Sequence, residues 1–148
     1  MGAAALALGL TANRSMTSID LSSNQLTNYG KDMTGIKELA AALGVNGTLT
    51  VTNLLRNELD AESAKMLAEV AKQKGTSLCG IRRDQTTAAF SRQGLNPPDA
   101  ILLVSDLSQA VVTGTLTECD LRYNDMGGEG KASIRDAVQG KAGFMLQL

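Results

Sequence analysis

The chain has 148 residues, no His, and a formal net charge of −1 from 14 Lys and Arg against 15 Asp and Glu. This balance argues against nucleic acid or an anionic membrane surface as the partner, because proteins that bind either are strongly basic. Two Tyr and two Phe are too few for a platform on which bases or sugars stack. The length and the hydrophobic fraction of 43% predict one compact domain, residues 1–148.

Residues 1–15 make up the first predicted element. The run from Gly2 to Leu10 is apolar and about as long as the core of a signal peptide, but no basic residue precedes it. Leu10 lies six residues before Met16, and the same spacing recurs one repeat later. We therefore predict an N-terminal helix that caps a stack of repeats. A cleaved or organelle-targeting segment is the alternative.

A short sequence pattern then recurs along the chain. Two apolar residues two positions apart face one side of a strand, and an Asn follows whose side chain can bond nearby backbone in a tight turn. A further apolar residue then returns to the core. The pattern occurs at residues 16–26, 49–59 and 116–126, and in degraded form, with Gln in place of Asn, at residues 85–95. Leu146 and Leu148 repeat the apolar pair and predict a closing strand.

The segments between the strands have helical periodicity. Apolar residues recur at a period near 3.6 over residues 35–43, 63–71 and 99–107, and more weakly over 130–138. No single strand and helix can bury its own apolar face, whereas stacked copies share one core. The alternation predicts a cap at 1–15, repeats at 16–48, 49–84, 85–115 and 116–142, and a closing strand at 143–148.

A strand, an Asn turn and a full helix in this order resemble the leucine-rich repeats of the ribonuclease-inhibitor-like subtype, over roughly residues 4–148. The runs Thr76-Ser-Leu-Cys-Gly-Ile and Phe90-Ser-Arg-Gln-Gly-Leu also look like repeat arrays of unicellular algae and other protists. The resemblance implies an α/β solenoid, or horseshoe, with parallel strands on the concave face and α-helices on the convex face. Insertions after Leu26 and after Ala71 depart from the usual period.

Candidate catalytic chemistry is sparse. The absence of His removes the commonest general base and the commonest metal ligand. Cys79 and Cys119 alone do not make a zinc site, and their places on different repeats disfavour a disulfide. The run Gly127-Gly128-Glu129-Gly130 lacks the Lys-Ser/Thr ending of a phosphate-binding loop. We therefore expect no catalysis, no metal and no cofactor.

The solvent-facing strand positions are the remaining candidates for function. Five strands about 4.8 Å apart would span roughly 20 Å, enough for a modest protein interface. Val51 and Leu55 would be exposed apolar residues there, either as a contact patch or as scattered surface residues. The predicted partner-binding residues of the concave face are Asp20, Val51, Asn53, Leu55, Glu118, Asp120 and Arg122.

The turn amides have a structural interpretation instead, because buried turn backbone needs hydrogen-bond partners. We expect their side chains to bond backbone between successive repeats. The predicted ladder consists of Asn24, Asn57, Gln93 and Asn124.

The scaffold predicts a non-catalytic module that binds another protein through the concave face or an end. The alternative is a structural or accessory subunit of a larger assembly, since Gly2 to Leu10 and Phe144 to Leu148 leave apolar ends. No apolar run is long enough for a membrane-spanning helix. The cysteine usage fits a reducing compartment, so we expect an intracellular location, in the cytoplasm or, if residues 1–15 are a targeting segment, in an organelle.

Overall fold

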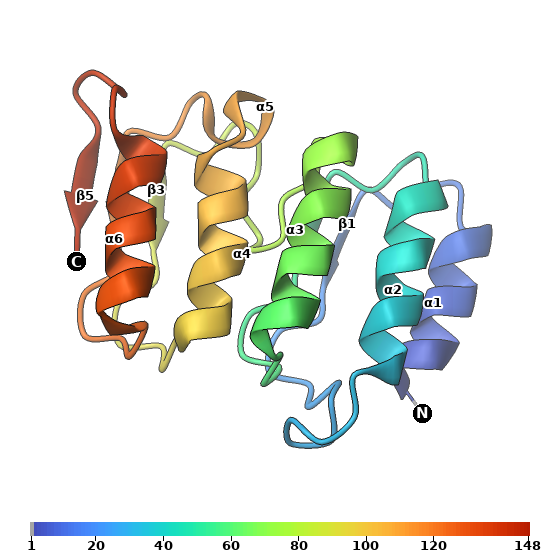
Figure 1. Cartoon of the computed structure of the whole chain (residues 1–148). Helices are drawn as coiled ribbons and strands as arrows, with labels where there is room; N and C mark the ends of the chain where they lie inside the picture. Colours follow the sequence, from blue (N-terminus) through green and yellow to red (C-terminus); the bar gives the residue numbers. More distant parts are fainter. Residues whose placement is uncertain (1) are drawn as a thin grey trace.

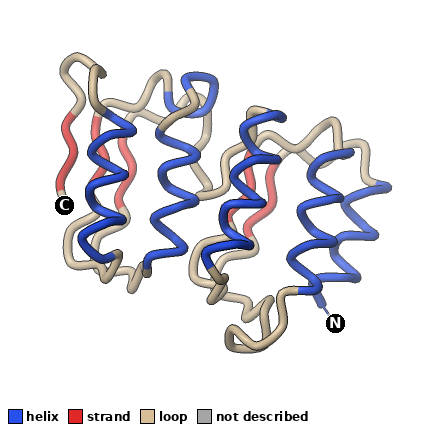
Figure 2. The backbone as a smooth tube through the Cα atoms, in the orientation of Figure 1, coloured by secondary structure: helices blue, strands red, loops and turns tan. Residues whose placement is uncertain are grey.

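The computed structural model describes residues 2–148 as helices that alternate with three-residue strands. The helices stand side by side in one row, and the strands lie behind that row (Figure 1, Figure 2). This confirms the predicted α/β alternation. The elements are α1 (Gly2–Ala12), β1 (Ser18–Asp20), α2 (Thr34–Val45), β2 (Val51–Asn53), α3 (Ala61–Lys74), β3 (Thr87–Ala89), α4 (Pro97–Leu107), α5 (Ala110–Thr113), β4 (Glu118–Asp120), α6 (Gly127–Val138) and β5 (Met145–Gln147).

The strands are parallel, as predicted, but they form two sheets instead of one row of five. β1 pairs with β2, and β3, β4 and β5 form a second sheet in that order. The edge of β2 that would meet β3 is taken by residues 76–80. Thr52 N donates to Ser77 O at 2.9 Å, and Gly80 N donates to Thr52 O at 2.8 Å. The insertion after Ala71 therefore splits the sheet.

One hydrophobic core nevertheless runs the length of the molecule. Leu39 of α2, Leu67 of α3 and Leu103 of α4 are each fully buried and belong to a single cluster. At the N-terminal end, α1 packs closely on α2, where a Cβ on Gly35 would lie only 2.5 Å from the Cβ of Ala3. The repeats thus share an interior that none could form alone.

Two of the four turn amides link successive repeats. Asn57 is fully buried; its Oδ1 accepts from Asn24 N at 3.0 Å and its Nδ2 donates to Leu21 O at 2.9 Å. Asn124 makes the equivalent bonds to the turn that follows β3. Each of these side chains reaches back to the preceding turn.

The side chains of Asn24 and Gln93 differ from the predicted ladder. Asn24 donates only to Ser22 O, and Gln93 donates only to Ala89 O at 3.4 Å, both within their own repeat. The described chain has no turn of this kind before Asn24. Residues 76–86, which precede Gln93, are an irregular segment without the matching turn, so Gln93 has nothing equivalent to reach.

Helix α4 spans the break between the two sheets with two buried carboxylates. Asp106 accepts hydrogen bonds from Ser77 Oγ at 2.6 Å, Leu78 N at 2.7 Å and the next backbone N–H at 3.1 Å. Asp99 accepts from Arg56 N at 3.1 Å, in the turn that follows β2. Through these two carboxylates, α4 therefore holds the inserted segment and the turn that follows β2.

Burial raises the pKa of Asp106 to about 6. The hydrogen bonds from residues 77–79 favour the charged form and lower the pKa, but the effect of burial is larger. A carboxyl with a raised folded pKa contributes most stability below its unfolded pKa of about 3.8 and loses that contribution as the pH rises through 6. Asp106→Asn removes the titrating carboxyl and keeps its shape. Its Oδ1 can still accept from Leu78 N, whereas its Nδ2 takes the place of the oxygen that accepts from both Ser77 Oγ and Cys79 N. It removes this pH dependence.

We expect the free energy of unfolding of the wild-type chain to fall by about 2 kcal/mol relative to Asp106→Asn between pH 4 and pH 7. Urea unfolding of both proteins at each pH measures this difference. Other carboxyls titrate equally in the two proteins and cancel. Parallel pH profiles would show that Asp106 keeps an ordinary pKa in the folded chain.

Candidate functional site

The candidate residues are distributed over two separate surfaces of the strand face, the side of the sheets opposite the helices. Asp20 is exposed and lies opposite Asn53 in the parallel register of β1 and β2. Glu118 and Asp120 lie on β4, and Arg122 follows them. Because the sheet is split, the first pair and the second group belong to different sheets.

Val51 and Leu55 are not exposed, so the prediction of an exposed apolar pair was wrong. Val51 is 8% exposed and Leu55 is 1% exposed. Residues 76–81 pair with β2 and are themselves largely buried. They lie so close that a Cβ on Gly80 would be 3.1 Å from the side chain of Asn53. An Asp at position 55 would therefore test folding and not partner binding.

The C-terminal sheet carries side chains that are held in place by one another. Asp120 forms an ion pair with Arg122 at 2.9 Å, and the hydrogen bonds from Arg122 lower the pKa of Asp120 to about 2. Glu118 Oε1 accepts from Gln147 Nε2 of β5 at 2.9 Å. The carboxylates here are fixed by partners on the protein surface before any ligand arrives.

Beside this ion pair lies a contact that the sequence analysis missed. The guanidinium of Arg92 lies 4.4 Å from the centroid of the Tyr123 ring, and Tyr123 is 67% exposed. Both residues directly precede a turn amide, and both have left-handed backbone, with φ of 56° and 62°. In the four repeats, the position before the turn amide is occupied by Ser23, Arg56, Arg92 and Tyr123. An Arg and a Tyr at this position in adjacent repeats were the sequence signal for the contact.

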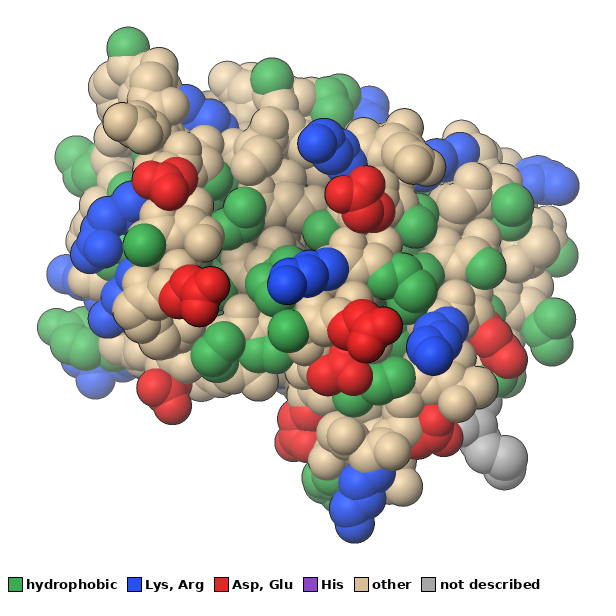
Figure 3. All heavy atoms as spheres, in the orientation of Figure 1, with side chains coloured by type: hydrophobic (Ala, Val, Ile, Leu, Met, Phe, Trp, Pro, Cys, Tyr) green, Lys and Arg blue, Asp and Glu red, His purple; other side chains and the backbone are tan. Residues whose placement is uncertain are grey.

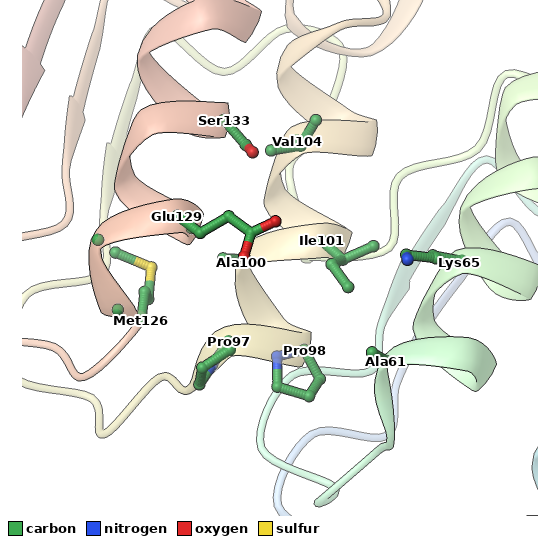
Figure 4. Close-up of a pocket in the computed structure, with 13 residues that line it drawn as sticks. Ala61, Lys65, Pro97, Pro98, Ala100, Ile101, Val104, Met126, Glu129 and Ser133 are labelled. Carbon is green, nitrogen blue, oxygen red and sulfur yellow. The ribbon is translucent and has the colours of Figure 1, made fainter.

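The helical side of the molecule has a groove of about 550 Å³ over α4 (Figure 4). Pro98, Ile101 and Val104 of α4 form its floor. One wall is the first turns of α3, with Ala61 and Lys65. The other wall is the start of α6, where small residues leave the floor uncovered; it consists of Gly127, Gly128, Glu129, Gly130 and Ser133.

The groups that could carry chemistry are buried thiols and scattered carboxylates. Burial raises the pKa of Cys119 to about 12 and that of Cys79 as well, so both stay protonated thiols at neutral pH. Within residues 2–148, no three Cys, Asp or Glu side chains gather in a way that could hold a metal ion. None of the helices in that range is long and apolar enough to cross a membrane.

Comparison with known protein families identifies two of the units. Residues 12–30, which contain β1 and Asn24, and residues 115–134, which contain β4 and Asn124, match the Leucine Rich repeat family. Both matches cover the strand and its Asn turn, the part of the unit whose spacing is most regular. A comparison with curated proteins found no match.

Proposed function

We propose that this chain is a non-catalytic module that binds another protein through its C-terminal sheet. The proposal starts from its leucine-rich repeats, which generally form protein-interaction modules. The proposed binding surface, called the C-terminal surface below, keeps Glu118, Asp120 and Arg122 from the sequence-based set. It adds Arg92 and Tyr123. The observation that carries the proposal is the pair of neighbouring contacts, Asp120 with Arg122 and Arg92 with Tyr123.

These side chains are suited to recognition because Tyr and Arg dominate the energetics of protein interfaces. Fixing a long side chain on binding costs about 0.5–1.5 kcal/mol, and the ion pair and the cation–π contact reduce that cost in advance. The surface presents an aromatic ring between charges of both signs, so it favours a partner with an apolar contact flanked by acidic and basic groups. Asp20 and Asn53 form a smaller polar surface on the other sheet.

Tyr123→Ala tests the proposal, with Tyr29→Ala as a matched control. Tyr29 is 59% exposed and also has left-handed backbone, with φ of 57°, but it lies in the loop that follows β1. Immobilised wild-type chain would be used to capture proteins from its native source, and mass spectrometry would quantify them. We expect Tyr123→Ala to reduce capture of the partner at least tenfold, and Tyr29→Ala to leave it unchanged. Equal capture by both variants would refute this surface.

A structural subunit is the second candidate, and the N-terminal end of the molecule favours it. Helix α1 has no charged residue, and Leu8 on its outer side is 77% exposed. A hollow of about 360 Å³ lies beside it, lined in part by Leu6, Met16 and Ile19. Light scattering of the wild-type chain and of Leu8→Glu distinguishes the candidates, because an assembly subunit would self-associate through this end and the variant would not.

A further inference from the structure

Helix α4 has the reverse of the usual surface-helix pattern. Its two charged residues, Asp99 and Asp106, are buried and hold backbone of the N-terminal half. Its outward residues Pro98, Ile101 and Val104 are apolar and half-buried. A solvated helix normally turns its charged side outward. The neighbouring helices α2, α3 and α6 do so, and Lys, Arg, Asp and Glu are interspersed over this face of the molecule (Figure 3).

The groove over α4 can take one helix. Neighbouring helices pack about 8–10 Å apart, so the axes of α3 and α6 lie roughly 16–20 Å apart on either side of α4. Subtracting two helix radii of about 5–6 Å leaves roughly 4–10 Å. The glycines of the α6 wall place this groove toward the upper end of that range, where an α-helix with small side chains fits. The floor from Pro98 to Val104 is two helical turns, or about 10 Å, long.

The lining of the groove favours a helix over an extended peptide. A strand would bring unpaired N–H and C=O groups against Ile101, Val104 and the prolines, and the groove has no sheet edge to receive them. A helix satisfies its own backbone and presents only side chains. Its apolar residues at i, i+3 or i+4, and i+7 would match a two-turn floor.

The charges on the two walls define the partner further. Lys65 extends from α3 and Glu129 from α6, and their side chains point toward one another across Ile101 (Figure 4). Neither belongs to an ion pair among the described residues, where the ion pairs are Arg82 with Asp84 and Arg122 with Asp120. One wall thus offers a free cation and the other a free anion, on the two sides of an apolar floor.

We propose that this groove binds an amphipathic α-helix of a partner protein, with a stripe of apolar residues flanked by an acidic row on one side and a basic row on the other. The apolar stripe covers Pro98, Ile101 and Val104. The acidic row meets Lys65, and the basic row meets Glu129. None of the residues of the C-terminal surface lines the groove, so this proposal stands or fails independently of the proposed function.

The probes are three synthetic peptides of about four helical turns with the same leucine stripe. One has glutamate on one flank and lysine on the other, the second has glutamate on both flanks, and the third has lysine on both. Binding to the full chain is followed by NMR amide shifts. We expect the mixed peptide to bind most tightly, with shifts confined to α3, α4 and α6. No saturable binding of the mixed peptide at millimolar concentration would overturn the proposal.

Two variants block the groove in different ways. Ile101→Asp places a charge on the floor, and Gly128→Phe fills the groove from a position where a Cβ would meet no atom within 4 Å. We expect each to weaken the mixed peptide at least tenfold. Val111→Asp, at a residue that is 50% exposed on α5, is the matched control and should change binding less than twofold. Undiminished binding by Ile101→Asp and Gly128→Phe would overturn the proposal.

A charge reversal tests the walls. Lys65→Glu makes both walls acidic, so we expect it to bind the peptide with lysine on both flanks about fivefold more tightly than the mixed peptide. The preference does not depend on which way the helix lies in the groove, because both flanks of that peptide are alike. An unchanged order of the three peptides would show that the wall charges do not select the partner.

Discussion

Replacing Asp106 by alanine is expected to lower the free energy of unfolding by about 3–5 kcal/mol. The alanine removes the acceptor for Ser77 Oγ and for the backbone N–H of Leu78, both in the buried segment that pairs with β2. A buried donor that loses its partner costs about 1–3 kcal/mol, and a cavity adds to this. The variant therefore weakens the joint between the two sheets.

Denaturant unfolding followed by circular dichroism gives the difference. Asp136→Ala on α6 is the matched control, because this aspartate is exposed and its side chain makes no hydrogen bond to the described residues. We expect the control to change stability by less than about 1 kcal/mol. Hydrogen exchange of Leu78 and Cys79 should quicken in Asp106→Ala before that of α6. A loss below 1 kcal/mol would mean that water replaces the carboxylate.

Asn57→Ala is expected to cost about 2–4 kcal/mol, and Asn24→Ala less than about 1 kcal/mol. Both are turn amides at equivalent positions of adjacent repeats. The side chain of Asn57 is fully buried and bonds backbone of two repeats, including Leu21 O and Asn24 N. That of Asn24 is exposed and bonds only Ser22 O. The sequence pattern alone would predict equal effects.

Thermal and urea unfolding of the two variants provide the comparison, and Asn124→Ala extends it to the second sheet. Asn124 also accepts from Leu95 N and donates to Leu121 O, so its substitution should resemble that of Asn57. Similar losses for Asn24→Ala and Asn57→Ala would show that the contribution comes from local turn geometry and not from the bonds between repeats.

The buried carboxylates and the apolar groove have a common origin in α4. Its inward side accepts hydrogen bonds from the backbone of the inserted segment and of the turn that follows β2, so Asp99 and Asp106 face inward. The outward side is left with Pro98, Ile101 and Val104. The insertion after Ala71 therefore affects both sides of the molecule: it divides the strand face and changes the helix that covers the division.

The sequence determined the alternation of strand and helix and the places of the core leucines. These follow from local chemistry, because a period of two or of 3.6 decides which side chains share a face. The apolar N-terminal run forms a helix that packs on α2, as its spacing from Met16 indicated. Residues 12–30 and 115–134, which match the leucine-rich repeat, contain two of the three segments with the undegraded pattern.

Only the tertiary structure decided which of these residues are accessible. Val51 and Leu55 alternate correctly for an exposed face, yet both are buried: Leu55 belongs to the hydrophobic core, and Val51 lies on the strand with which residues 77–79 pair. The Arg92–Tyr123 contact is made between residues of two repeats, and the groove over α4 is lined by residues of three helices. Periodicity fixes the side of a strand or helix on which a residue lies. Whether that side meets solvent depends on an inserted segment whose position is set by long-range hydrogen bonds to Thr52 and Asp106.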